Sequence, residues 1–410
     1  MSKYKLLLIF FDIYPQSTIN QIYKSLSYLK KLTPINSKLM ILDLTNFSFK
    51  KIKNNYIHSD EEIEYFKPNS LKELRKLKLD FKKYQKIYAL GPVYSDIKSV
   101  FIFLILKYLN IKIILINYFG YFLNEQNHIK HNLIYKINRF FKFKFMYFIS
   151  RLFSLFSIFP NIEHYFETSQ IRIKQLNNTF AKKFSNLTKH FNFSYAKNVH
   201  RINSIYYDQI LDGIKNTPSD KYTIIVDSGF DHPDRYLREK IINKEKHELD
   251  RKKYFENLYY FLRLIQNLYQ NKIIFCKHPK TNYRLDTYYK TIEKEFDIEL
   301  GKTDDLINSG ELIIFTGSSS MINKAIIQKK KIIYALSESI GKYQNDQILS
   351  FTKNIDIPII NIEKINEINI NKLNNCINES VNKYNEFIEN NLIHEQNIFS
   401  FQQIKNILYE

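Results

Sequence analysis

The chain has 410 residues, with 61 Lys and Arg against 41 Asp and Glu, which gives a formal charge of +20 at pH 7. The length corresponds to two or three domains, and an apolar fraction of 44% excludes a disordered chain. Two cysteines exclude a disulfide framework, and no CxxC motif or Cys/His cluster offers a zinc site. Eight glycines, with neither GxGxxG nor GxxxxGK[ST], exclude glycine-rich phosphate loops, so a phosphate site here needs other groups.

The N-terminus predicts a strand and not a targeting segment. The apolar run 6–11 is shorter than the core of a signal peptide, and Asp12 closes it. The sequence has no run of 18 uncharged apolar residues, so no membrane-spanning helix is expected. We therefore expect a cytoplasmic protein.

The positive charge is concentrated in residues 126–201, which hold thirteen Lys or Arg and only two acidic residues. Within this region, 134–159 interleaves basic and aromatic residues in a helix-compatible pattern. Such a segment suits the interface of an anionic membrane and indicates a peripheral protein on the inner face of the cytoplasmic membrane. The alternative is a core helix with a basic polar face. No motif supports nucleic acid as a partner.

The first half of the chain alternates predicted strands and helices. Strands are expected at 4–11, 38–44, 85–90, 111–116 and 161–168, and helices at 18–31 and 95–109. This order is typical of a parallel sheet covered by helices on both faces.

A polar, Asn/Lys-rich stretch at 177–220 ends in a turn cluster and separates the halves. A second series follows, with strands at 222–226, 272–276, 311–315 and 331–335 and helices at 252–270, 283–296, 318–328, 370–389 and 396–409. The sequence thus predicts an N-terminal α/β lobe at 1–200, a second α/β lobe at 215–385 and a C-terminal helix at 386–410.

Three strands of the second half end in chemically distinctive clusters. Strand 222–226 is followed by the segment 227–234, strand 272–276 by 277–280, and strand 311–315 by 316–320. Ligands of open parallel sheets bind beyond the carboxyl ends of the strands, so we expect these three clusters to surround one site.

The cluster after the third strand predicts an anion site. Gly317 precedes three consecutive hydroxyl residues, Ser318, Ser319 and Ser320, which open a helix. Hydroxyls and backbone N–H groups at a helix N-terminus bind phosphate, whereas simple capping needs only one Ser or Thr.

Lys277, His278, Pro279 and Lys280 follow the neighbouring strand. Pro279 favours an extended conformation at His278, so its imidazole is expected to project from the strand tip. There it can donate to a phosphate oxygen or protonate a leaving group. The alternative is a structural histidine.

The identity of the general base stays open. Asp227 is our first choice, although a strand-end Asp can also cap a helix or orient His278. Further candidates are Asp231 and His232 in the same loop. In the first half they are Asp12, Asp96 and Glu125.

At these residues the sequence resembles bacterial GT-B glycosyltransferases of surface polysaccharide synthesis, especially the sialyltransferase and polysialyltransferase-like group and Kdo transferases. That group has a His-Pro motif and a Ser/Thr-rich motif that bind the phosphate of a CMP-linked sugar acid. His278-Pro279 matches the first and Ser318–Ser320 the second, over about 272–336. The resemblance implies a GT-B-like fold, with two Rossmann-like lobes facing across a cleft. It also implies that the lobe at 1–200 lies on the acceptor side and that the lobe at 215–385 binds the nucleotide sugar.

The family's third motif, two acidic residues before a Gly, supplies the base and lies in the N-terminal lobe. The similar string here is Asp227-Ser228-Gly229, which replaces one acid and lies in the second half. The sequence therefore differs from the family in the motif that supplies the general base.

The resemblance implies transfer of a CMP-activated sialic-acid-like or Kdo sugar to a glycan or glycolipid acceptor, such as lipooligosaccharide or capsule. Neither metal nor cofactor is expected, because Lys, His and the helix dipole would stabilise the departing phosphate. Three alternatives remain: a CDP-polyol phosphotransferase of teichoic-acid type, a sugar-nucleotide epimerase, and a non-enzymatic membrane-surface scaffold.

Overall fold

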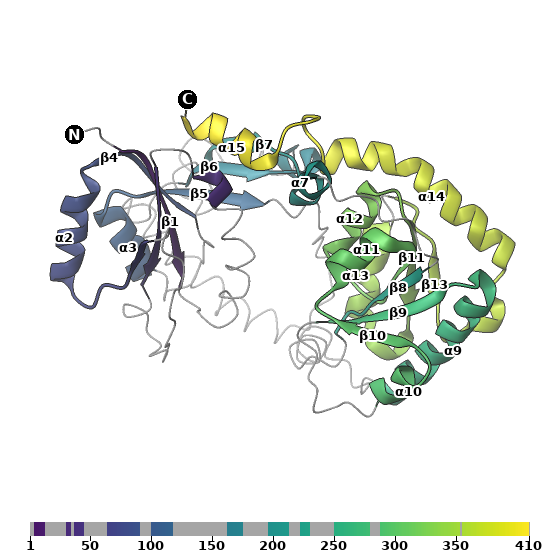
Figure 1. The fold of residues 1–410 in the computed structure, drawn as a ribbon. Coiled ribbons are helices and arrows are strands. Elements are labelled where there is room, and N and C mark those ends of the chain that lie inside the picture. The colour runs from purple at the N-terminus through teal and green to yellow at the C-terminus, as the bar shows by residue number, and fades with distance from the viewer. Residues whose placement is uncertain are drawn as a thin grey trace, which may run out of the picture. The chain divides into compact units, whose positions relative to one another are not determined.

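The computed structural model describes residues 4–12, 30–33, 37–44, 64–90, 100–117, 162–174, 196–212, 222–229, 250–278, 288–352 and 355–409. The chain forms two compact units (Figure 1). Among the described residues, unit 1 holds those up to Asn203 and from Glu395 onward, and unit 2 holds Ser204–His394. The C-terminal division differs from the predicted one, because the last helix belongs to unit 1 and the helix before it runs past residue 385.

Unit 1 is built on a parallel sheet with the strand order β3-β2-β1-β4-β5-β6-β7. Its strands are β1 (Tyr4–Asp12), β2 (Lys38–Asp43), β3 (Glu64–Phe66), β4 (Tyr84–Leu90), β5 (Lys112–Asn117), β6 (Ile162–Glu167) and β7 (Ala196–Arg201). Its helices are α2 (Leu71–Phe81), α3 (Val100–Tyr108) and α15 (Ser400–Tyr409). The sequence patterns did not predict β3, α2 or β7.

The helix α15 is held on unit 1 by hydrogen bonds to distant parts of the chain. Lys86 Nζ donates to the carbonyl of Leu408 at 3.0 Å. The backbone N–H of Asn203 donates to Gln403 Oε1 at 2.7 Å. These bonds explain why the C-terminal residues belong to unit 1.

Unit 2 contains a second parallel sheet, in the order β10-β9-β8-β11-β12-β13. Its strands are β8 (Tyr222–Val226), β9 (Lys272–Lys277), β10 (Asp297–Leu300), β11 (Gly310–Phe315), β12 (Lys331–Leu336) and β13 (Ile359–Asn361). Its helices are α7 (Ile205–Leu211), α9 (Arg251–Tyr269), α10 (Tyr289–Glu293), α11 (Thr303–Ser309), α12 (Met321–Ile327), α13 (Lys342–Thr352) and α14 (Ile370–Asn391), with 3-10 turns η6 (Glu338–Ile340) and η7 (Ile365–Glu367).

Both faces of this sheet are buried, which explains its nearly continuous apolar strands. Ile225 packs in the core formed with α9 and α10. Its neighbour Ile224 points to the other face and packs in the core formed with α11, α12 and α13. The helix α14 joins both cores, through Ile377 in the first and Tyr384 in the second.

The predicted α/β fold class is therefore confirmed for both units. In the described part of the chain, the helix expected at 283–296 is present only as α10, and the helix expected from Ser318 begins at Met321. The short elements β10, α11 and β13 were not predicted.

Candidate functional site

The carboxyl ends of three adjacent strands meet at one edge of the unit 2 sheet. Val226 of β8 is in register with Cys276 of β9 and with Phe315 of β11. The amide of Asp227 donates to the carbonyl of Cys276 at 3.0 Å, and the amide of Thr316 donates to the carbonyl of Val226 at 3.2 Å. The three predicted clusters therefore begin side by side.

The segment 227–229 connects the other two clusters. On the β11 side, the amide of Ser228 donates to Thr316 Oγ1 at 2.9 Å. On the β9 side, the imidazole of His278 lies against Gly229, because a Cβ on residue 229 would stand only 2.7 Å from His278 Cγ. Gly229 has a φ of +65°, a conformation that glycine adopts without strain. His278 and Thr316 thus flank the end of β8.

Neither His278 nor the serines are sealed inside the core. His278, Ser318, Ser319 and Ser320 are half-buried, while Thr316 is fully buried. The strands β9 and β11 lie on either side of β8, and two strands separated by one other strand are roughly 10 Å from each other. The half-buried imidazole and the half-buried hydroxyl cluster therefore follow the two strands that flank β8.

The serine cluster leads into α12 without relying on all three hydroxyls for capping. Ser319 Oγ accepts a hydrogen bond from the amide of Met321 at 3.3 Å. Ser320, the residue before the helix, has helical backbone angles and makes no side-chain capping bond. The hydroxyl of Ser319 therefore serves the helix start, as expected for a cap.

Asp227 is buried and positions its neighbours. Its exposed fraction is 3%. Its Oδ2 accepts hydrogen bonds from the hydroxyl of Tyr289 at 2.9 Å and from the backbone N–H of His278 at 3.2 Å. A general base must reach the proton it removes, and this carboxylate instead holds the backbone of His278. These contacts favour a positioning role for Asp227, and its role as the base stays a prediction from the sequence.

The side chain of Lys277 contacts α10, on one face of the sheet. Its ammonium pairs with Glu293 Oε1 at 2.9 Å and lies 4.6 Å from the centre of the Tyr289 ring. Side chains alternate along a strand, so Lys277 faces α10, opposite to Cys276. Its charge is already matched by Glu293, and its contacts fix α10 to the strand end.

Several predicted site residues lie outside the described residues, namely Pro279, Lys280, Asp231, His232, Glu125 and Asp96. Asp12 is described as backbone only, as the last residue of β1 in unit 1. Gly317 is buried between Thr316 and the serines.

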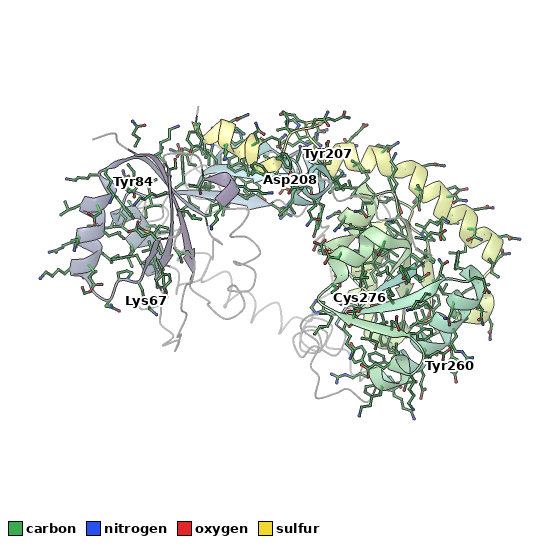
Figure 2. All side chains as sticks on the ribbon, in the orientation of Figure 1. Lys67, Tyr84, Tyr207, Asp208, Tyr260 and Cys276 are labelled. Carbon is green, nitrogen blue, oxygen red and sulfur yellow. The ribbon has the colours of Figure 1, made fainter. Side chains whose placement is uncertain are left out.

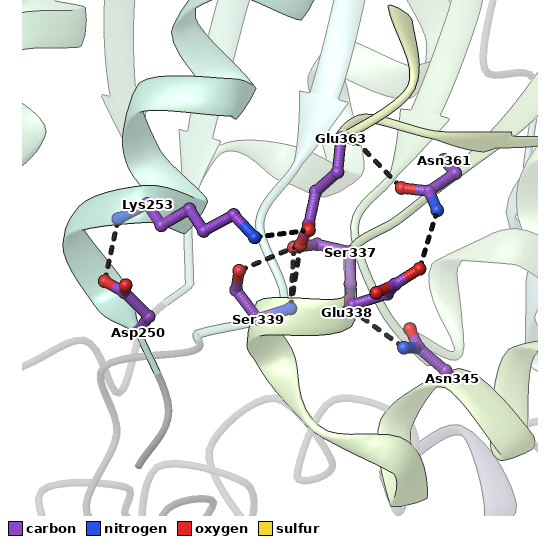
Figure 3. Close-up of polar contacts among 8 residues, drawn as sticks. All are labelled: Asp250, Lys253, Ser337, Glu338, Ser339, Asn345, Asn361 and Glu363. Atoms are coloured by element: carbon purple, nitrogen blue, oxygen red, sulfur yellow. Dashed lines mark hydrogen bonds and ion pairs between the residues drawn. The ribbon is translucent and has the colours of Figure 1, made fainter. Parts of the chain in front are cut away.

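A second polar cluster, which sequence reasoning missed, lies at the same sheet edge beyond β12 and β13 (Figure 3). Glu363 accepts hydrogen bonds from Ser337 Oγ at 2.7 Å and from the amide and hydroxyl of Ser339 at 2.9 and 2.8 Å. It also pairs with Lys253 Nζ of α9 at 2.9 Å. The only sequence signal was another Ser-rich strand end, at Ser337 and Ser339.

The electrostatics of this cluster favour an ionised carboxylate. Burial raises the pKa of Glu363, but the hydrogen bonds from Ser337, Lys253 and Ser339 together outweigh it and lower the pKa to about 2. The charged glutamate ties the start of α9 to the loop after β12, which stiffens this part of the edge.

Unit 1 has a comparable anchor at the end of β6. Glu167 is fully buried and accepts from Asn117 Nδ2 at 2.9 Å and from the Tyr165 hydroxyl at 2.9 Å. It also accepts from the amides of Thr168 and Ser169, and Arg172 Nε lies 3.5 Å away. This carboxylate fixes its own loop and is not accessible to a substrate.

The thiol of Cys276, next to the candidate site, is unreactive. Cys276 is buried, and its burial raises the pKa of the thiol to about 12, so it stays protonated. Figure 2 shows it within unit 2.

Within the described ranges, no group of three or more His, Cys, Asp or Glu residues could hold a metal ion. None of the helices described combines the length and hydropathy that a membrane-spanning segment requires.

Comparisons with known proteins identify the fold alone. The sequence matches no protein-family model and no curated protein. A UDP-glucosyltransferase from Polygonum tinctorium has a similar structure at a TM-score of 0.51 and 8% identity, covering 100% of this chain and 99% of that one. The UDP-GlcNAc 2-epimerase of Methanocaldococcus jannaschii matches at a TM-score of 0.44 and 14% identity (98% and 99% covered), and MurG of Acinetobacter baumannii at 0.41 and 11% (98% and 98%). The chain therefore has a GT-B-like fold of two parallel α/β units.

Proposed function

We propose that this protein is a glycosyltransferase that binds a nucleotide-activated sugar at the carboxyl edge of the unit 2 sheet. The observation that carries the proposal is the imidazole of His278 held against Gly229, beside the Thr316–Ser320 segment that is hydrogen-bonded to the same loop. A histidine and a hydroxyl cluster at neighbouring strand ends suit the oxygens of a phosphate.

In the proposed reaction, an acceptor hydroxyl forms a bond to the anomeric carbon of the sugar while the bond from that carbon to the phosphate oxygen breaks. His278 and the hydroxyls of Ser318–Ser320 stabilise the negative charge that develops on the departing nucleotide. Asp227 and Tyr289 hold the backbone of His278 in place for this task.

Because Asp227 is buried and accepts hydrogen bonds from Tyr289 and His278, we propose a different residue as the base that takes the proton of the acceptor hydroxyl. Asp231 and His232 follow Gly229 by two and three residues in the sequence. We propose that one of these two residues takes the proton. Asp12, Asp96 and Glu125 of the first half are the other candidates.

For the donor, we propose a CMP-linked sialic-acid-like or Kdo sugar, and for the acceptor a cell-surface glycan or glycolipid. Support comes from the order and spacing of His278-Pro279 and Ser318–Ser320 along the sequence. The Polygonum tinctorium enzyme, with a TM-score above 0.5, is named a UDP-glucosyltransferase, so UDP-sugars are the second donor class to test.

Product analysis tests the proposal. The full chain is incubated with CMP-, UDP- and GDP-linked sugars and with CDP-glycerol in the presence of an envelope glycolipid extract, and the products are read by mass spectrometry. A glycosidic bond with release of free nucleotide supports the proposal, and a phosphodiester product supports the polyol phosphotransferase. An epimerised donor without acceptor identifies the epimerase, and no turnover supports the scaffold.

Matched histidine variants link the chemistry to the site. His278→Ala should lower turnover by about 10² or more, because a donor to the developing charge is lost. His394→Ala removes an exposed histidine of the same unit and should leave turnover unchanged. Equal turnover of the two variants would contradict the site.

A further inference from the structure

The outer surface of α2 and α3 in unit 1 exposes large apolar side chains. Leu71 is 69% exposed, Leu79 63%, Tyr108 42% and Leu104 38%. The two helices are in direct contact, because Lys78 Nζ of α2 lies 4.0 Å from the centre of the Tyr108 ring of α3. We refer to these four apolar residues, with the basic residues among them, as the α2–α3 surface.

Helix geometry explains how one helix has both a buried and an exposed apolar side. Leu74, Leu77 and Phe81 are the buried residues of α2. Successive residues lie about 100° apart around the axis, which places Leu79 opposite these three. Leu71 lies between Leu79 and the side of the helix that contacts α3.

The basic residues of α2 share the exposed arc with its leucines. At about 100° per residue, Lys72, Arg75 and Lys78 fall on the arc that holds Leu71 and Leu79. On α3, Lys107 is exposed about one turn after Leu104 and next to Tyr108 in the sequence.

The acidic residues of α2 lie on its other flank. Glu73 accepts a hydrogen bond from the amide of Asn69 at 2.8 Å, and both Glu73 and Asp80 line a groove against β2 and β3. The α2–α3 surface is therefore both apolar and positively charged, with the acids turned away from it.

We propose that the α2–α3 surface docks unit 1 onto an anionic phospholipid bilayer. Exposed leucines and a tyrosine ring are stabilised when they enter the headgroup region. Lysine and arginine stems extend alongside them and keep their charges in water. Each basic residue near an anionic surface adds a further attraction. A neutral partner surface would leave these charges unmatched.

This docking surface is distinct from the basic, aromatic segment 134–159, which lies outside the described residues. The inference also does not rest on the proposed function. Vesicle binding is measured without any nucleotide, so its failure would leave the glycosyltransferase proposal untouched.

The absence of tryptophan from the sequence provides a specific reporter. Leu79→Trp places a single indole on the α2–α3 surface. Tyr260→Trp places one on α9 of unit 2, where Tyr260 is 61% exposed (Figure 2). With phosphatidylcholine vesicles containing phosphatidylglycerol, emission of the Leu79→Trp indole should shift to shorter wavelength and be quenched by brominated lipid, while that of Tyr260→Trp should not.

Binding variants of the full chain complete the test. Leu71→Ser with Leu79→Ser should lower partitioning to the anionic vesicles about tenfold or more, and Tyr260→Ser should leave it unchanged. Lys72→Gln with Arg75→Gln should lower it about fivefold per charge removed. Vesicles of phosphatidylcholine alone, or higher salt, should weaken binding of the unmodified chain.

Three results would overturn the proposal. The first is no blue shift or quenching at Leu79→Trp, and the second is equal partitioning of the leucine variants and the unmodified chain. The third is a change in sedimentation of the protein alone when Leu71 and Leu79 are replaced, since this would identify the surface as an interface between copies of the chain.

Discussion

Gly229 and His278 fit together so closely that residue 229 has no room for a side chain. A Cβ there would stand 2.7 Å from His278 Cγ and 2.9 Å from His278 Nδ1. The backbone at Gly229, with a φ of +65°, independently favours glycine. This contact fixes where the imidazole lies at the end of β8.

We predict that Gly229→Ala displaces the His278 imidazole and lowers nucleotide affinity about tenfold or more. Gly301→Ala is the matched control, because Gly301 also has a positive φ, +76°, but nothing lies within 4 Å of its added Cβ. Both variants carry a similar backbone penalty of about 1 kcal/mol. Thermal unfolding and calorimetric titration with nucleotide separate the two effects, and equal affinity of both variants would contradict the contact's role.

The positioning role of Asp227 predicts a specific kinetic pattern. Asp227→Asn and Tyr289→Phe each remove part of one hydrogen-bonded unit, so each should raise KM for the donor by a similar factor. Because the groups contact each other, their effects in the double variant should be less than additive. If Asp227 were the base, Asp227→Asn alone would lower kcat about 10²–10⁴-fold, and Tyr289→Phe would not.

The carboxylate of Glu363 predicts a pH-dependent contribution to the stability of unit 2. Its pKa is about 2 in the folded chain against an ordinary value of 4.5. The stabilisation is therefore complete above pH 4.5 and is lost as the pH falls from 4.5 towards 2.

We expect Glu363→Gln to lower the free energy of unfolding by about 2 kcal/mol at pH 7. The difference between the variant and the unmodified chain should shrink below pH 4.5, as read from urea unfolding at a series of pH values. Glu367→Gln, at a nearby exposed glutamate, should change little. A difference that stays constant down to pH 2 would exclude the charged carboxylate as its source.

A histidine pair in unit 1 predicts a second pH-dependent contribution to stability, closer to neutral pH. His164 Nδ1 lies 2.9 Å from His200 Nε2, so one ring donates and the other accepts. Burial lowers the pKa of both rings, and their mutual repulsion lowers that of His164 further, against a raising effect of Glu163 and with small lowering effects of Lys112 and Lys86.

A lowered folded pKa means that the unfolded chain protonates first, so unit 1 should lose stability as the pH falls below about 6.5. His200→Gln should flatten this dependence, and His394→Gln, at an exposed histidine, should not. Unfolding midpoints between pH 8 and 5 check this. An unchanged slope for His200→Gln would remove the pair as the cause.

The strand-end site could be predicted because parallel strands bring their carboxyl ends to one edge. The sequence pattern correctly placed the segments after Val226, Cys276 and Phe315 together, since their strands are continuous apolar runs. Periodicity cannot show which way a polar side chain at a strand tip turns. The contacts of Lys277 with Glu293 and of Asp227 with Tyr289 therefore could not be predicted from the sequence.

Other elements could not be predicted from the sequence, for different physical reasons. The helix α2 is rich in lysine and has exposed leucines, so its apolar positions do not follow one face. The strand β13 has only three residues, and the Glu363 cluster joins segments far apart in sequence. Contacts of this kind depend on tertiary structure and leave no local pattern.

The most direct test of the account is calorimetric titration of the full chain with CMP, CDP, UDP and GDP. The measurement is repeated for His278→Ala and for the control His394→Ala. We predict that at least one nucleotide binds the unmodified chain and the control equally, and that its affinity for His278→Ala falls about tenfold or more. Binding of no nucleotide, or equal binding to all three proteins, would contradict a nucleotide site at the end of β8.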